Sequence, residues 1–364
     1  MTGGAGADGA EPDGAGPDGT GADGAGADGA AVAPDDATEL EAIRAAYPTL
    51  TWDSAERIDE GWDHVVMICR GCSGADAHGH RELVFRFPAD DQALAQLPTE
   101  IAVLDHLAGR VDAALPHYSH VPAHGRFAGY PLVRGQRLTP ELFDSLPATE
   151  RTTLAAQLGA MLAALHIQDT SAPPIDRVPH SYQPENLDFV RGIVDNNLPA
   201  VFTDAEMATA REICDEVGAL QSTLLPRVLL HNDVYVRHLY WDRGQAAGQA
   251  AGQAAGGLGG AGGASGPGGP GGPGRLGLID FTDMCLGDPA VDFAELYEYG
   301  PRFVEDVLAH YTGRADETFL DRAWTYQRFA ALYMIAGHLY YGVESWEHAR
   351  SAFDRCRSPR RPRA

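Results

Sequence analysis

Two low-complexity segments divide the sequence and limit what it can fold into. About the first 36 of its 364 residues repeat Gly, Ala and Asp, with eight acidic residues and no basic one. Residues 245–274 consist almost entirely of Gly, Ala, Gln and Pro. Neither segment has enough apolar surface to offset the entropy lost on ordering. We therefore expect a disordered tail over residues 1–40, a flexible insertion at 245–274, and a folded protein built from the remainder.

The sequence after the tail begins with β-strand patterns. Residues 64–69 and 82–87 are short apolar or β-branched runs on either side of a Gly-rich turn, which favours two paired strands. A helix is expected at 99–107, and two more short strands are expected within 119–133. This part of the chain therefore predicts a small β-rich unit.

From about residue 139 the pattern is mainly helical. Residues 150–166 carry Leu and Met at helical spacing. Further helices are expected at about 203–223, 290–309 and 316–340. A β-rich part followed by a helical part predicts an α+β protein with two lobes and a cleft between them.

The charged residues exclude some kinds of chemistry. The chain has no lysine, so all 27 basic residues are arginine. A lysine Schiff base and the Gly-Lys step of a P-loop are therefore excluded. The net charge of -24 disfavours a nucleic-acid partner, because phosphate binding needs a basic face. Such a field favours a cationic small molecule.

The distribution of apolar residues and cysteines bears on the compartment. No run of 18 or more apolar residues is present, so no membrane partner is expected. The first residues lack the basic and apolar regions of a secretory signal. The five scattered cysteines fit a reduced compartment better than a disulfide framework. We therefore expect a cytoplasmic protein.

Two carboxylates stand at the ends of apolar strand patterns. Asp233 follows the apolar pair at 229–230, and Asp280 follows the apolar run at 276–279. With the insertion left out, 236–241 and 276–279 form a hairpin that Asp233 precedes and Asp280 closes. Phosphoryl transfer needs one carboxylate for the acceptor hydroxyl and another for magnesium. Taken alone, Asp233 is better explained as a capping residue in a turn, and Asp280 could cap a strand end, although its position after an apolar strand argues against that.

The order of the motifs adds a family resemblance. The motifs are His231-Asn232-Asp233 with His238 five residues after Asp233, then Ile279-Asp280-Phe281, then Gly287-Asp288-Pro289-Ala290-Val291-Asp292. This series resembles the aminoglycoside and macrolide phosphotransferases, which share the protein-kinase-like fold. The resemblance covers about residues 50–345. It implies a nucleotide-binding lobe at 48–134 and a catalytic and acceptor-binding lobe at 135–350. The arginine-rich segment at 351–364 is expected, from its composition, to be a basic, solvated tail.

The resemblance also implies roles for single residues of the second lobe. Asp233 would be the catalytic base, and His231 would brace its loop. Asp280 would bind Mg²⁺, with His238 at the second metal position. Arg237 is a cation beside that position.

In the first lobe, the resemblance points to the nucleotide, ATP or GTP. Gly61 belongs to a nucleotide-covering turn at residues 60–63. Arg86 would contact the phosphates and pair with Glu100, and Val133 lies in the hinge that follows.

Three positions depart from the family pattern. Asn232 stands where the family usually has Gly, although Asn tolerates unusual dihedral angles better than most residues. His238 stands where Asn is usual, and imidazole is a weaker magnesium ligand than oxygen. Arg86 stands where Lys is usual, and arginine is a good phosphate ligand.

Several other polar residues have alternative interpretations. Asp288 is expected to be structural, Asp292 to brace the catalytic loop, and His166 to cap the end of its helix. Cys69 and Cys72 are interpreted as free thiols rather than zinc ligands. An acidic and aromatic set either shapes the acceptor pocket or forms a solvated helix face; its members are Glu295, Glu298, Glu305, Tyr326, Tyr333 and Glu344.

The function that follows is a small-molecule kinase. It would transfer the γ-phosphoryl group of a nucleotide to a hydroxyl of an aminoglycoside-like or other antibiotic. Two alternatives stay open: a kinase of the same fold that acts on an amino alcohol, a sugar or a nucleoside, and a non-catalytic protein that only binds nucleotide or ligand.

Overall fold

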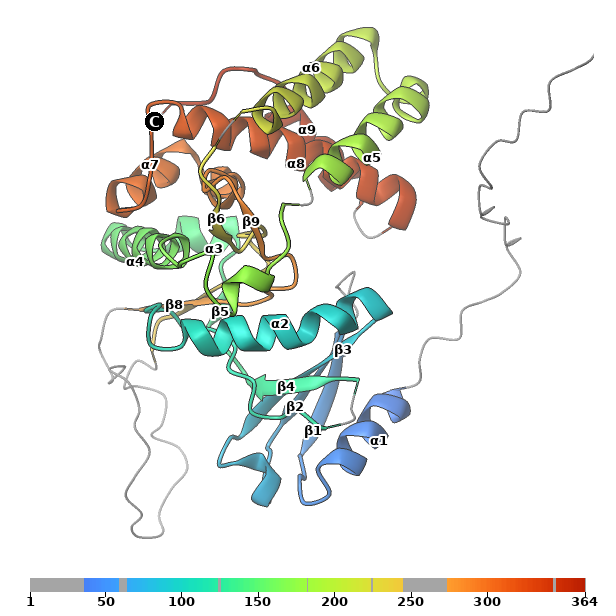
Figure 1. Ribbon diagram of the computed structural model, residues 1–364, viewed down its shortest axis with the longest axis vertical. Coiled ribbons are helices and arrows are strands. Elements are labelled where there is room, and N and C mark those ends of the chain that lie inside the picture. The colour runs from blue at the N-terminus through green and yellow to red at the C-terminus, as the bar shows by residue number, and fades with distance from the viewer. Residues whose placement is uncertain are drawn as a thin grey trace, which may run out of the picture.

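The computed structural model describes seven stretches of the chain: residues 36–58, 64–123, 126–181, 183–223, 225–244, 274–342 and 345–363. Figure 1 shows a sheet with two helices at one end of the molecule and a larger group of helices at the other. The expected α+β class and two-lobed architecture are confirmed. The predicted turn at 60–63 and almost all of the predicted insertion lie outside the described residues.

The N-terminal lobe is a four-stranded antiparallel sheet in the order β1-β2-β3-β4. Its elements are α1 (Asp36–Ala46), β1 (Ser54–Ile58), β2 (His64–Arg70), the 3-10 turn η1 (Ala75–Ala77), β3 (Glu82–Pro88), α2 (Asp91–Leu107) and β4 (Ala128–Pro131). Residues that alternate along a strand face opposite sides of a sheet. Met67 and Phe85 therefore pack with Ile43 of α1, whereas Val66 and Val84 face the rest of the molecule.

The C-terminal lobe contains two small antiparallel sheets. The first joins β5 (Gln136–Arg137), β7 (Leu239–Asp242) and β8 (Arg275–Leu278), and the second joins β6 (Val228–Leu230) and β9 (Cys285–Gly287). The helices are α3 (Pro140–Ser145), α4 (Ala148–His166), α5 (Gln183–Asn196), α6 (Asp204–Gln221), α7 (Pro301–His310), α8 (Phe319–Tyr341) and α9 (Trp346–Arg355). Short 3-10 turns are η2 (Ile175–Arg177), η3 (Leu198–Ala200), η4 (Val291–Phe293) and η5 (Glu295–Tyr299).

Several helices begin at side chains that satisfy their first N–H groups. Asp90, Thr139 and Ser345 each accept a hydrogen bond from a backbone N–H three residues on, at the start of α2, α3 and α9. Thr203 and Glu206 form a reciprocal capping box at the start of α6. These caps fix where each helix starts, and thus how it packs.

One hydrophobic core runs through both lobes. It includes Val84 of β3, Leu104 of α2, Leu158 of α4 and Leu278 of β8. A second core lies among α5, α6, α8 and α9. The shared core means that the N-terminal sheet is packed onto the helical lobe and not merely tethered to it.

Several expected boundaries differ from the structure. The single helix expected at 290–309 is instead η4, η5 and α7, because Gly300 has a φ of 91° and Pro301 starts a new helix. The helix expected at 99–107 begins eight residues earlier, at Asp91. Helices α1, α5 and α9 were not expected, and α1 places ordered chain before the predicted limit of the tail at residue 40.

The C-terminal segment is largely exposed, as expected, but parts of it pack on the helical lobe. Cys356 is buried, and the carbonyl of Ser358 accepts a hydrogen bond from the Trp324 indole. Arg361 forms ion pairs with Glu305 and Asp321. Its arginines therefore tie the segment to acidic helices. Across the described residues, no helix is long and apolar enough to cross a membrane.

Candidate active site

Two strand pairings bring the predicted carboxylates together. In the β7–β8 pair, Leu239 lies opposite Leu278, which confirms the expected hairpin. In the β6–β9 pair, Leu230 lies opposite Cys285. The loop that carries Asp233 leaves β6 and enters β7, and the loop that carries Asp280 leaves β8 and enters β9. Both aspartates are thereby held at the same end of the two small sheets.

Asp292 holds the loop that carries Asp233. Its carboxylate is almost fully buried and accepts hydrogen bonds from the backbone N–H groups of His231 at 3.0 Å and Asn232 at 2.7 Å. It also accepts one from His166 Nε2 at 3.0 Å. The expected bracing role of Asp292 agrees with these contacts. His166 is not a simple helix cap, because its ring links Asp292 to the Tyr311 hydroxyl.

Both site loops contain a residue in the left-handed backbone conformation. Asn232 has a φ of 70° and Asp280 a φ of 66°. Apart from glycine, Asn and Asp adopt this region more readily than other residues. The turn therefore accommodates Asn232 in place of the Gly that is usual in the family, as expected for an asparagine.

His231 is a neutral residue that supports the loop carrying Asp233. Its ring is fully buried, and burial lowers its pKa. Nε2 lies 3.0 Å from the carbonyl oxygen of Ile279, so it must carry a hydrogen and donate. Nδ1 accepts from the backbone N–H of Asp233 at 3.3 Å. His231 thus joins the loop before Asp233 to the strand before Asp280.

His238 lies between the two aspartates. Its Nδ1 is 3.2 Å from Asp233 Oδ2, and its Nε2 is 3.6 Å from Asp280 Oδ2. Burial opposes the charged form, but Asp233 and Asp280 outweigh burial and raise the pKa of His238 to about 9. At neutral pH the ring is therefore an imidazolium that bridges two carboxylates.

Arg86 reaches the site from the other lobe. It is only 3% exposed, and its Nη1 donates to Glu100 Oε1 at 2.7 Å, which agrees with the expected pairing. Its Nη2 donates to Asp280 Oδ1 at 2.7 Å and to the Thr282 hydroxyl at 2.6 Å. Burial alone would raise the pKa of Asp280, but Arg86 holds it well below its usual value.

Glu295 is the acidic residue of the predicted acceptor region that reaches Asp233. Burial and the neighbouring Asp233 carboxylate raise the pKa of Glu295, and the two side chains share a hydrogen bond. A hydrogen bond between two carboxyl groups requires a proton on one of them, and the raised pKa favours that proton on Glu295. The other described members of that set are engaged elsewhere: Glu298 with Arg355, Glu305 with Arg361, Tyr326 with Asp288, and Tyr333 with Phe189.

The remaining predicted residues have different positions. Val133 is buried, and a Cβ built on Gly277 would come within 2.8 Å of its Cγ1, so the segment after β4 packs closely on β8. The guanidinium carbon of Arg237 is 5.8 Å from the centre of the Tyr235 ring. Asp288 accepts hydrogen bonds from Arg322 and Tyr326, which agrees with a structural role. Gly61 and Glu344 lie outside the described residues.

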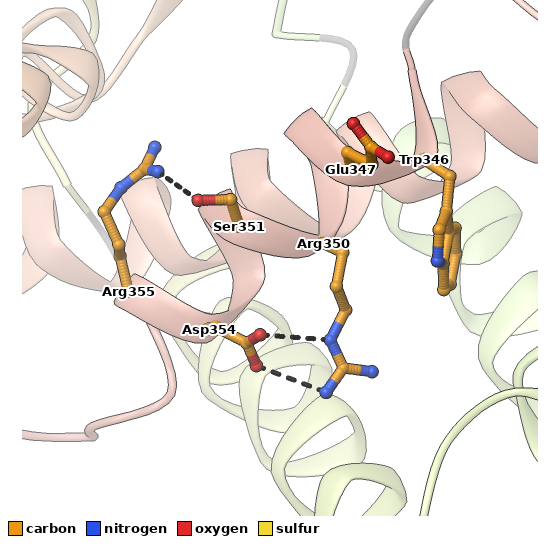
Figure 2. Close-up of a pocket in the computed structure, with 6 residues that line it drawn as sticks. All are labelled: Trp346, Glu347, Arg350, Ser351, Asp354 and Arg355. Carbon is orange, nitrogen blue, oxygen red and sulfur yellow. Dashed lines mark hydrogen bonds and ion pairs between the residues drawn. The ribbon is translucent and has the colours of Figure 1, made fainter.

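An open pocket of about 550 Å³ lies away from these groups, along α9. Its lining residues are Trp346, Glu347, Arg350, Ser351, Asp354 and Arg355. Figure 2 shows that Arg350 is paired with Asp354, and Arg355 with Ser351. Its arginines already have partners, and the motifs of the sequence lie elsewhere, so Asp233 and Asp280 remain the candidate site.

In the part of the chain that the structure describes, no group of three or more His, Cys, Asp or Glu side chains is arranged to hold a metal ion. Cys69 and Cys72, which lie three residues apart, are buried free thiols. Burial raises the pKa of Cys69 to about 12.

Comparison with known proteins identifies the family. The sequence matches the model of the phosphotransferase enzyme family over residues 54–249 and 270–332. The chain belongs to this family. The predicted phosphotransferase class is therefore confirmed.

Solved structures show the same fold. The GDP complex of wild-type aminoglycoside 2'-phosphotransferase-IIIa is 19% identical, with a TM-score of 0.69, over 89% of this chain and 98% of that one. The streptomycin–ATP ternary complex of APH(2")-IIa is 18% identical, with a TM-score of 0.58, over 88% and 95%. The apoenzyme of macrolide 2'-phosphotransferase MphH from Brachybacterium faecium is 20% identical, with a TM-score of 0.56, over 89% and 99%.

The positive φ of Asn232 predicts how substitutions there affect the stability of this phosphotransferase. Asn232→Gly should leave the free energy of unfolding nearly unchanged, whereas Asn232→Ala should lower it by about 1 kcal/mol, because alanine is strained at positive φ. Urea unfolding of the two variants measures the difference. Asn196 in α5 is the matched control, where alanine should be more stable than glycine. The same ranking at both positions would contradict this account.

The charge on His238 generates a second prediction. Because its folded pKa is raised from 6.5 to about 9, the added stability is fully present below pH 6.5 and is lost as the pH rises through 9. Without nucleotide, the phosphotransferase should lose at most about 3 kcal/mol over this range relative to His238→Gln. Urea unfolding at several pH values checks this. Parallel pH profiles for the two proteins would show that His238 is not held in its charged form.

Proposed function

We propose that this phosphotransferase moves the γ-phosphoryl group of ATP or GTP to a hydroxyl of an aminoglycoside-like or other antibiotic. The observation that carries the proposal is the convergence of Asp233, Asp280 and Arg86. Two carboxylates and a guanidinium from different lobes meet at one place. Phosphoryl transfer is catalysed mainly by positioning and by stabilising charge on the phosphoryl oxygens.

Asp233 is assigned to the acceptor hydroxyl. Its side chain is 30% exposed, so a hydroxyl can approach it, and its backbone is fixed through His231. A carboxylate at this point orients the hydroxyl and takes its proton as the bond to phosphorus forms. His238 holds the same carboxylate from the other side and thereby fixes its direction.

Asp280 is assigned to Mg²⁺. Magnesium prefers oxygen ligands, and the Asp280 carboxylate is 37% exposed and fully ionised, so it fits this metal. When bound, the ion would neutralise charge on the nucleotide phosphates. His238 fits less well in the present arrangement, because a protonated ring has no lone pair for a metal. His238 would have to lose its proton to serve as the second ligand.

The nucleotide assignment rests on Arg86 and on the relatives. Arg86 places Nη2 at 2.7 Å from Asp280 Oδ1, and a guanidinium is suited to phosphate oxygens. Related structures were solved with GDP and with ATP. Gly61 and Val133 complete the proposed nucleotide site, Gly61 through the covering turn and Val133 through the hinge.

The acceptor class rests on charge. The hydrogen-bonded pair of Asp233 and Glu295 shares one proton and keeps one negative charge, and the chain as a whole carries a net charge of -24. Related enzymes were solved with kanamycin and with streptomycin. A hydroxyl on a cationic molecule is therefore the favoured acceptor. A cytoplasmic location would give the protein access to the nucleotide.

A coupled assay of nucleoside-diphosphate release tests the proposal. ATP or GTP with Mg²⁺ is supplied together with aminoglycosides, macrolides, nucleosides or small amino alcohols. We expect one acceptor class to stimulate release. Asp233→Asn should lower that stimulated rate about a hundred- to ten-thousandfold, because the hydroxyl loses its base, while nucleotide affinity stays close to that of the unaltered protein.

Asp195→Asn, an exposed carboxylate in α5, is the control and should keep full activity. Stimulation by a metabolite alone would assign the protein to metabolite phosphorylation. Nucleotide binding without turnover of any acceptor would favour a protein that only binds. Full activity in Asp233→Asn would remove Asp233 from the mechanism.

A further inference from the structure

His64 is a buried residue with no role in the proposed mechanism. It is the first residue of β2, directly after the segment at 60–63 that resembles the nucleotide-covering turn. Val66 lies opposite Arg86 in the β2–β3 register, so His64, two residues earlier, faces the same side of the sheet. Its side chain therefore points toward the group of Arg86 and Asp280, and it is only 7% exposed.

The contact with Arg86 fixes which ring nitrogen of His64 carries hydrogen. Nδ1 lies 3.2 Å from Arg86 Nη2. The hydrogens of Nη2 are directed at Asp280 and Thr282, and a guanidinium cannot accept a hydrogen bond, so a hydrogen on Nδ1 would face an N–H group. Nδ1 therefore keeps its lone pair, and Nε2 carries the hydrogen. Burial and the positive charge of Arg86 lower the pKa of His64 to about 3, against the opposing pull of Asp280 and Asp90. The ring is therefore neutral.

Within the described residues, the Nε2–H group of His64 has no acceptor. It is buried, and none of the described residues accepts a hydrogen bond from it. Buried donors are almost always paired in native proteins, so an unpaired one needs an explanation. By contrast, His231 has the same tautomer, and its Nε2 is satisfied by the Ile279 carbonyl.

We propose that His64 Nε2–H donates a hydrogen bond to a phosphate oxygen of the bound nucleotide. The proposal rests on the proposed function, because it assumes that a nucleotide occupies the space beside Arg86 and Asp280. A phosphate oxygen is a strong acceptor that arrives only with the ligand, which explains why the donor is unpaired in its absence. His64 would recognise the phosphates as a neutral donor beside the charged Arg86, and it would not contact the base.

Two substitutions separate this role from simple support of Arg86. The amide of Asn can occupy the position of Nδ1 but cannot reach that of Nε2, whereas the amide of Gln can place a donor near Nε2. Calorimetry would measure the binding of non-hydrolysable analogues of ATP and GTP, and of adenosine and guanosine. His64→Asn should weaken triphosphate binding about ten- to hundredfold and leave nucleoside binding unchanged. His64→Gln should retain most of the triphosphate affinity.

Other results would overturn the proposal. Full triphosphate affinity in His64→Asn, with loss in His64→Gln, would show that His64 acts only as an acceptor for Arg86. An equal loss of triphosphate and nucleoside binding would show a structural role. Absence of nucleotide binding by the unaltered protein would instead refute the proposed function itself.

The unaltered protein provides a readout that does not depend on a variant folding. In ¹⁵N-labelled protein, the His64 Nε2–H signal, assigned by its loss in His64→Gln, should shift when triphosphate is added. Nucleoside alone should leave it in place. A signal that triphosphate does not move would refute the contact.

Discussion

The arrangement of the site depends on the contacts that the buried guanidinium of Arg86 makes. A cation that is 3% exposed needs compensation, and Glu100 and Asp280 each supply a carboxylate at 2.7 Å. These partners lie on α2 and after β8, so one side chain joins the sheet, the helix behind it and the catalytic lobe. A lysine ammonium is a compact point charge, whereas the planar fork of arginine can hold two partners on separate nitrogens. The arginine in this lysine-free chain therefore keeps the expected pairing with Glu100 and adds a direct link to Asp280.

A second constraint fixes the loop that carries Asp233. Asp292 binds two successive backbone N–H groups of the loop, at His231 and Asn232, and His166 holds Asp292 from the core. The loop is thus held by a buried carboxylate before any substrate arrives. Positioning of this kind is the main contribution that a protein makes to phosphoryl transfer. The imidazolium of His238 completes the arrangement by keeping two carboxylates close together without a metal.

The sequence predicted the elements whose signals are local. The strands at 64–69 and 82–87, the hairpin on either side of the insertion and the unusual backbone at residue 232 follow from periodicity, from paired apolar runs and from residue type. Contacts between distant residues could not be predicted in this way. The bond from His166 to Asp292 joins residues 126 apart, and that from Arg86 to Thr282 joins residues 196 apart. Helix α1 and the ion pairs of the C-terminal arginines were not predicted, because they depend on partners elsewhere in the chain. The unpaired nitrogen of His64 is visible only once the register of β2 and β3 is known.

A double-mutant cycle on Arg86 and Asp280 tests the central claim that this pair couples the two lobes. The free energy of unfolding would be measured in urea for Arg86→Met, Asp280→Asn and the double variant, without nucleotide. The exposed pair Arg302 and Asp306 on α7 provides a reference cycle, for which coupling of about 0.3–0.5 kcal/mol is expected. We predict a coupling energy of at least about 1 kcal/mol between Arg86 and Asp280. Additive effects, with coupling no larger than that of the surface pair, would contradict the claim.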